Sequence, residues 1–148
     1  MVASDRTAWQ TWLVQDQRFV SDRPDVLTYR TEVLTHPLRL SGQPVADLWA
    51  ATSGSDADWI VKIIDVFPGQ NAAHPEMAGF ELPLSLDIFR GRYHASFEHP
   101  QALNPGEPVR YRFSLPAINH VIEPGHRLMI QIQSTLFPLY DRNPQSYV

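Results

Sequence analysis

Thirteen prolines are spread over the whole 148-residue chain, and this spacing constrains its fold more than any other feature. They are Pro24, Pro37, Pro44, Pro68, Pro75, Pro83, Pro100, Pro105, Pro108, Pro116, Pro124, Pro138 and Pro144. Proline has no backbone N–H to donate and its ring clashes with the preceding helical turn, so long helices cannot form at this spacing. The prolines therefore predict short extended segments joined by turns.

Between the prolines, apolar and polar residues alternate with the two-residue period of a half-buried strand. The predicted strands are residues 27–33, 38–40, 45–52, 59–67, 80–89, 109–115 and 127–133. In the last of these, Leu128, Ile130 and Ile132 lie on one side of an extended chain, with polar residues between them. Residues 45–52 and 59–67 are apolar on both sides, which predicts strands covered on both faces.

Turn signals between these segments favour a sandwich of antiparallel strands. Residues 53–56, Ser-Gly-Ser-Asp, predict a hairpin between the strands on either side of them. Residues 116–124 are predicted to be a crossing connection without a strand. Seven or eight strands with turns at intervals of about 8 to 12 residues are typical of a sandwich or barrel. Because several connections are too long for tight hairpins, we expect an all-β, jelly-roll β-sandwich and not an up-and-down barrel.

The length of the chain predicts one domain with a connector in front of it. We assign residues 1–20 to the connector and residues 21–148 to the sandwich. Trp9, Trp12 and Leu13 have the spacing of one face of a helix, so the connector forms either one or two helical turns or an extended segment.

Composition excludes several classes of protein. The net charge is -4 and Lys62 is the single lysine, which argues against a nucleic-acid partner. No apolar run approaches the roughly 20 residues of a membrane span, so we expect a soluble chain without a membrane partner. The absence of cysteine excludes disulfides and a cysteine nucleophile, but it does not locate the protein in the cell.

Catalytic and metal-binding motifs are absent from the sequence. No serine lies in a G-x-S-x-G turn, so we expect no catalytic residue in this chain. The six histidines include the spacings H-x4-H and H-x5-H, but neither pair lies on a predicted helix or beside a carboxylate cluster, so we expect neither metal nor cofactor. Asp56 and Asp58 resemble the start of a calcium loop without its further oxygen donors, so we interpret them as part of a turn.

Candidate interface or loop-fixing residues remain. Trp49 and Trp59 flank the 53–56 turn and could form a sugar-binding platform, and Tyr140 is a further candidate for a ligand contact. At strand spacing, packing in the core or at an interface is the favoured role of the two tryptophans. Residues 137–144 read as a fixed loop after the last strand. Arg90, Arg92, Asp141 and Arg142 are expected to fix loops, because guanidinium groups hold carboxylates and carbonyls in defined geometry.

Four long blocks of the chain, residues 15–34, 45–69, 89–109 and 119–145, resemble the C-terminal domain of the X-Pro dipeptidyl-peptidase (S15) family. That family includes cocaine esterase and α-amino acid ester hydrolases. The blocks include VADLWAATSGSDADWIVKIIDVFPG and EPGHRLMIQIQSTLFPLYDRNPQ, and they follow one another in the family's order.

The resemblance implies a jelly-roll domain, similar to galactose-binding modules, that packs against an α/β-hydrolase domain carrying a Ser-Asp-His triad. It implies a parent serine hydrolase that cleaves an ester or amide next to a small acyl or aminoacyl group. No triad residue maps onto this chain, so the implied role is to support the catalytic domain and flank its substrate cleft.

The resemblance also leaves points open. The upstream domains of the family are not in this sequence, so the chain is either a fragment or a stand-alone relative. Family members continue to a further strand after the position of Val148, so an unpaired edge is expected, and such an edge favours self-association. Periplasmic, secreted and cytoplasmic bacterial locations all stay open. A stand-alone carbohydrate-binding or small-ligand-binding module is the alternative to the accessory domain, and fold analogy supports it only weakly.

Overall fold

The computed structural model describes residues 14–148, so Trp9, Trp12 and Leu13 of the connector lie outside the described residues. It contains eight strands, one short α-helix and two 3₁₀ turns within that range. The strands are β1 (Leu27–Arg30), β2 (Leu38–Gly42), β3 (Val45–Ala50), β4 (Asp58–Val66), β5 (Glu81–Arg90), β6 (Val109–Ser114), β7 (Ile118–Ile122) and β8 (Arg127–Gln133). Helix α2 is Arg18–Ser21, and the 3₁₀ turns are η1 (Pro75–Met77) and η2 (Gly91–Tyr93).

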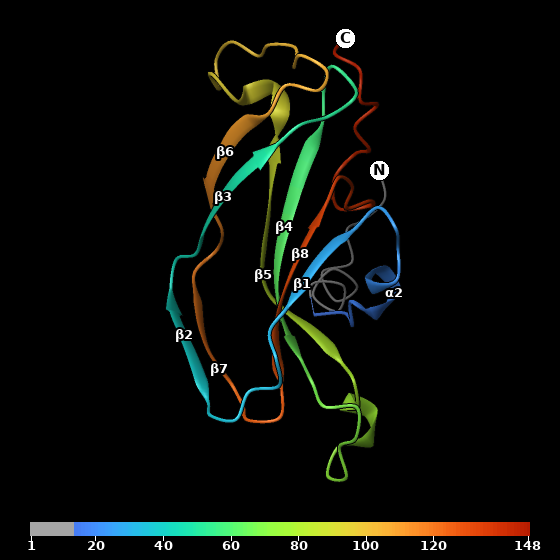
Figure 1. The fold of residues 1–148 in the computed structure, drawn as a ribbon, viewed down its shortest axis with the longest axis vertical. Helices are drawn as coiled ribbons and strands as arrows, with labels where there is room; N and C mark the ends of the chain where they lie inside the picture. Colours follow the sequence, from blue (N-terminus) through green and yellow to red (C-terminus); the bar gives the residue numbers. More distant parts are fainter. Residues whose placement is uncertain (1–13) are drawn as a thin grey trace, which may run out of the picture.

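The strands form two layers, and every pairing is antiparallel (Figure 1). One layer is a four-stranded sheet in the order β1-β8-β4-β5. The other layer consists of the pairs β2-β7 and β3-β6. The predicted all-β antiparallel sandwich is therefore confirmed. No helix in residues 14–148 combines the length and apolar character needed to cross a bilayer.

Pairing between the strands is nested. The hairpin β4-β5 is the innermost pair, and β3-β6, β2-β7 and β1-β8 enclose it in turn. The outermost pair joins residues about a hundred positions apart, with Tyr29 opposite Ile130. The chain is thus a long two-stranded ribbon that has folded over on itself to make both layers.

Strand β4 is buried on both faces, as its apolar sequence predicts. Val61 and Ile63 lie in the core between the layers with Ala46, Leu115 and Ile118. On the opposite face Ile60, Lys62 and Ile64 have no exposed surface. Figure 1 shows α2 on this side of the four-stranded sheet, away from the second layer. Val20 in α2 and Gln17 just before it are also buried.

Three sequence-based expectations about the strands were wrong. Strands β3 and β4 do not form a hairpin, because β3 pairs with β6 and β4 pairs with β5 and β8. Strand β3 is not covered on both faces, since Trp49 is 71% exposed. Residues 118–122, expected to be a connection, form β7 opposite β2. Each error concerns long-range pairing, which local alternation does not encode.

Candidate functional site

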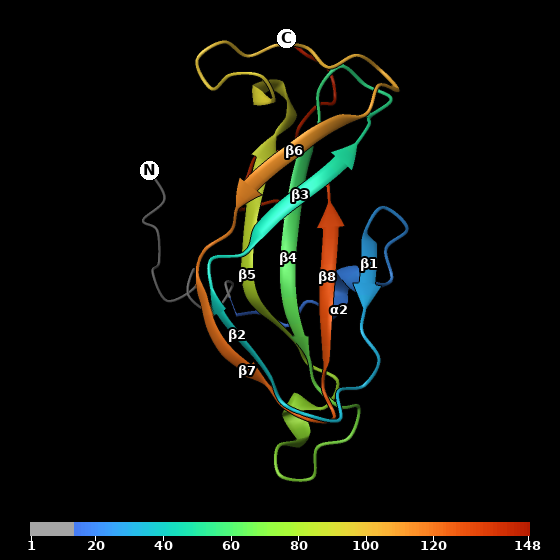
Figure 2. The same ribbon diagram turned by 60° about the vertical axis from the view of Figure 1, so that its left-hand side comes forward.

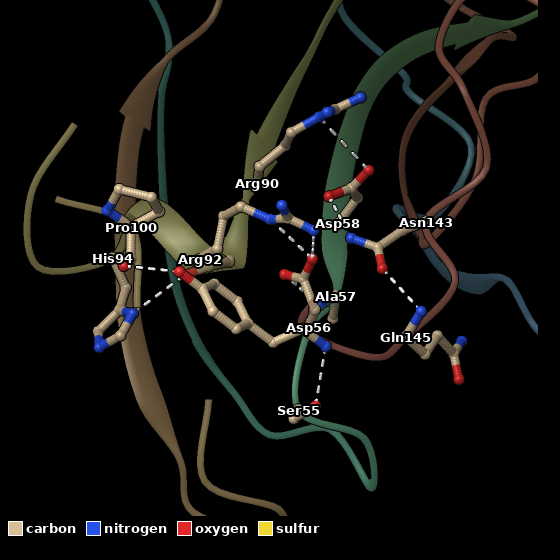
Figure 3. Close-up of polar contacts among 12 residues, drawn as sticks. Ser55, Asp56, Ala57, Asp58, Arg90, Arg92, His94, Pro100, Asn143 and Gln145 are labelled. Carbon is tan, nitrogen blue, oxygen red and sulfur yellow. Dashed lines mark hydrogen bonds and ion pairs between the residues drawn. The ribbon is translucent and has the colours of Figure 1, made fainter. Parts of the chain in front are cut away.

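Residues 53–58, the last part of the β3-β4 connection and the first residue of β4, lie at one end of the sandwich. Two other parts of the chain make polar contacts with them. The end of β5 and the segment after it contribute Arg90, Arg92 and Leu103, and the C-terminal segment contributes Asn143, Gln145 and Tyr147. We call these residues the end cluster, and Figure 3 shows Asp56, Asp58, Arg90, Arg92 and Asn143 of it as sticks.

Asp56 is the fully buried centre of one half of the end cluster. Its Oδ2 accepts hydrogen bonds from Nε of Arg92, at 2.9 Å, and from Nη2 of the same guanidinium. Its Oδ1 accepts the backbone N–H of Ala57 at 2.9 Å. The hydrogen bond to Asp56 raises the pKa of Arg92. A buried carboxylate with a paired cation and a backbone donor is satisfied on both oxygens.

Asp58 is the centre of the other half and is 2% exposed. Its Oδ1 accepts Nδ2 of Asn143 at 2.8 Å, and its Oδ2 lies 3.8 Å from Nε of Arg90 (Figure 3). Burial raises the pKa of Asp58, while the Asn143 hydrogen bond and the Arg90 charge act in the opposite direction. Asn143 is thus a direct tie between the C-terminal segment and the start of β4.

Backbone contacts complete this attachment. The N–H of Ser55 donates to the carbonyl oxygen of Gln145 at 3.1 Å, and the N–H of Tyr147 donates to Ser55 Oγ at 2.9 Å. The Tyr147 hydroxyl donates to the carbonyl of Pro100 at 3.0 Å, and Arg92 lies over the Tyr147 ring. A Cβ added at Gly54 would be 2.2 Å from the carbonyl oxygen of Gln145, so only glycine fits there.

The charged residues singled out in the sequence have different positions. Arg90 and Arg92 contact the buried carboxylates of the end cluster. Asp141 is exposed, and Arg142 lies with its guanidinium carbon 5.0 Å from the centre of the Phe137 ring. The polar tie at this loop is made by Asn143, which sequence analysis missed because an asparagine beside a proline reads as an ordinary turn residue.

The structure does not bring the aromatic candidates together. Trp49 points outward from β3, opposite Arg110, whereas Trp59 lies opposite Phe89 in the other layer. Trp59 packs against Tyr111, with ring centroids 5.6 Å apart. Tyr140 is half-buried, and this burial raises the pKa of its hydroxyl. The assignment of these residues to an interface stays a prediction.

Hydrogen bonds of the serines and histidines show no nucleophile and base in contact. Within residues 14–148, Ser21 bonds Glu81 and Gln131, and Ser85 bonds the carbonyl of Pro116. Ser96 Oγ accepts the backbone N–H of His99, but no serine hydroxyl in this range bonds a histidine ring nitrogen. Asp65, at the other end of β4, bonds two histidines: Nε2 of His120 at 2.8 Å and Nδ1 of His126 at 2.7 Å. In the described part of the chain, residues 14–148, no group of three or more His, Cys, Asp or Glu side chains is placed to hold a metal ion.

The fold and the end cluster define a two-layer antiparallel β-sandwich whose polar side chains hold its own loops in place. Comparison with known families identifies this domain. Residues 2–148 match the model of the X-Pro dipeptidyl-peptidase C-terminal non-catalytic domain, and the chain belongs to this family.

Solved structures and curated proteins give the same result. An α-amino acid ester hydrolase superposes with a TM-score of 0.94 at 60% identity, over 97% of this chain and 24% of that one. An aminopeptidase from a marine-sediment Thaumarchaeota archaeon superposes with a TM-score of 0.93 at 53% identity, over 99% of this chain and 24% of that one. Cocaine esterase of Rhodococcus sp. (strain MB1 Bresler) is 39% identical over 128 residues, which are 86% of this chain and 21% of that protein.

The chain matches only part of each relative. The chain spans about a quarter of the length of the solved relatives, and about a fifth of the length of cocaine esterase. It corresponds to their β-sandwich part.

Proposed function

We propose that this chain is the non-catalytic β-sandwich domain of a serine hydrolase that acts on esters or amides of small acyl or aminoacyl groups. The observation that carries the proposal is the 60% identity and TM-score of 0.94 to a quarter of an α-amino acid ester hydrolase, over nearly the whole of this chain. Two further relatives are named as an aminopeptidase and a cocaine esterase, and both names describe cleavage of an amide or ester bond at an acyl group.

The role of the domain in that hydrolase is to support the α/β-hydrolase domain and flank its substrate cleft. The end cluster supports this role, because buried ion pairs and backbone bonds hold three segments in one arrangement. Loops that are already rigid lose little conformational entropy when a neighbouring domain packs on them. The division into a connector, residues 1–20, and a sandwich, residues 21–148, is part of the proposal.

An assay of the isolated chain beside the full-length hydrolase tests this function. The 148-residue chain is expected to show no turnover of aminoacyl esters, aminoacyl-prolines or phenyl esters. The full-length protein is expected to hydrolyse at least one of these classes, and a serine-directed inhibitor should abolish the activity. Inhibitor-sensitive turnover by the isolated chain would contradict the proposal.

A further inference from the structure

The two layers of the sandwich do not cover each other completely. Figure 2 shows β8 and β1 lying beyond the edge of β3, with no strand of the second layer in front of them. A groove of about 360 Å³ opens on this side of the molecule. Its lining includes Leu40 and Pro44 from one layer and Ile63, Leu128 and Ile130 from the other. The groove is thus a gap in the apolar core.

Strand β1 extends the apolar floor of this groove. Its register with β8 places Leu27 opposite Ile132 and Tyr29 opposite Ile130, and paired residues point to the same face of a sheet. Ile130 and Ile132 face the core, so Leu27 and Tyr29 face the groove side, where they are 57% and 59% exposed. We call this surface the β1-β8 strip.

The polar residues of β1 point the other way. Thr28 lies opposite the buried Gln131, and Arg30 reaches Met129 Sδ and the carboxylate of Glu81 on the α2 side. An alternation that places Leu27 and Tyr29 toward open space, and Thr28 and Arg30 toward the α2 side, is the reverse of a solvent-exposed edge strand, whose polar residues point to open space. The sequence of β1 therefore fits a strand whose groove side is covered in the complete protein.

We infer that the β1-β8 strip and the groove beside it are the surface on which the catalytic part of the parent hydrolase packs. The inference rests on the proposed function. In the solved relatives this domain is only 24% of the chain, so about three quarters of the polypeptide lies outside these residues and is available to cover the strip. Interfaces between domains of one chain bury about 600 to 1,500 Å², so we expect the contact to include the rim of the groove as well as the strip.

The rim specifies part of the partner's chemistry. Arg39 lines the groove, is exposed, and forms no ion pair within residues 14–148. We therefore expect the surface of the catalytic part to be apolar where it contacts Leu27 and Tyr29. Opposite Arg39 it should present a carboxylate or a backbone carbonyl. The outer face of β3 differs, because Trp49 there is surrounded by the paired charges of Asp47, Arg110 and Arg112.

Cysteine labelling in the full-length hydrolase tests this surface, since residues 1–148 contain no cysteine of their own. Leu27→Cys and Tyr29→Cys report on the strip, and Trp49→Cys is the control on the outer face. The side chains at all three positions are more than half exposed in this domain. In the full-length protein we expect a maleimide to react with the two strip cysteines about ten times more slowly than with the control.

Equal labelling rates at the strip and control positions, in a full-length protein that hydrolyses an ester, would contradict the assignment of the packing surface. The proposed function would still stand. Protection that disappears on dilution would assign the strip to a second copy of the chain, and would also overturn the inference. Absence of serine-hydrolase activity in the wild-type full-length protein would remove the function, and the inference with it. Two strip positions are used so that one poorly folding variant does not decide the result.

Discussion

Lys62 is the single lysine of the chain, and its side chain is fully buried in the middle of β4. Its Nζ donates to Oε1 of Gln17 at 2.7 Å, which ties the segment before α2 to the sheet. Burial lowers the pKa of Lys62 to about 8, with the Arg23 charge acting in the same direction and the Glu81 charge against it. A buried ammonium without a close carboxylate carries a desolvation cost.

This pKa gives the stability of the domain a pH dependence of defined sign. Between pH 8 and 10.5 the unfolded chain holds the Lys62 proton and the folded chain does not, so stability rises with pH in this window. Relative to Lys62→Met, the wild type should gain about 2 kcal/mol between pH 7 and pH 9.5. Urea denaturation of both proteins at several pH values measures this. Parallel pH profiles would show that Lys62 has an ordinary pKa.

Gly54 makes a second residue-level prediction. Alanine at this position would place its Cβ 2.2 Å from the Gln145 carbonyl oxygen, a backbone atom that cannot move without releasing the C-terminal segment. We expect Gly54→Ala to lower the free energy of unfolding by about 2 kcal/mol or more. Gly69→Ala is the matched control, because nothing lies within 4 Å of its added Cβ. Urea denaturation of both variants should separate them, and equal midpoints would contradict the close approach.

At the scale of elements, the end cluster joins the C-terminal segment to the start of β4 through one side chain. Asn143→Ala leaves the buried Oδ1 of Asp58 without its donor, which should cost about 1 to 3 kcal/mol. The N–H of Ser55, which donates to Gln145, should then exchange its hydrogen faster. Asn104→Ala is the control, because its bond to Glu107 is exposed. Hydrogen exchange unchanged in both variants would show that Asn143 is not the tie.

The strands were predictable because their signal is local. Leu128, Ile130 and Ile132 alternate with polar residues, and any partner strand would preserve that alternation. The partners of β3 and β4 were not predictable, because a Ser-Gly turn is compatible with a hairpin and with a crossing between layers. Strand β7 escaped prediction because Asn119 and His120 interrupt its apolar residues.

The end cluster was predictable only in part. Arginines near strand ends indicate ion pairs, and Arg90 and Arg92 do meet carboxylates. Their partners, Asp56 and Asp58, were interpreted as turn residues. The segment that buries them lies more than thirty positions away, and local sequence does not indicate that contact. Trp49 was expected in the core or at an interface; its 71% exposure on β3 excludes the core, and its place at an interface stays a prediction.

At the scale of the whole molecule, if the proposed function holds, packing on the β1-β8 strip should determine how long the full-length hydrolase keeps its activity on heating. Tyr29→Asp introduces a charge that the covering surface would have to desolvate, whereas Trp49→Asp introduces one on a face already occupied by charges. We expect the half-life of hydrolytic activity at elevated temperature to fall about tenfold for Tyr29→Asp only. Similar half-lives for the two variants would place the contact elsewhere.

The nested ribbon has a consequence for synthesis. Tyr29 leaves the ribosome about a hundred residues before Ile130, its partner in the outermost pair. The inner hairpin β4-β5 can close early, but the edge strand must wait, and such distant pairing is slow. During that interval the apolar side chains of β1 have no partner strand, so a nascent chain of this kind is most in need of a chaperone just before its last strand emerges.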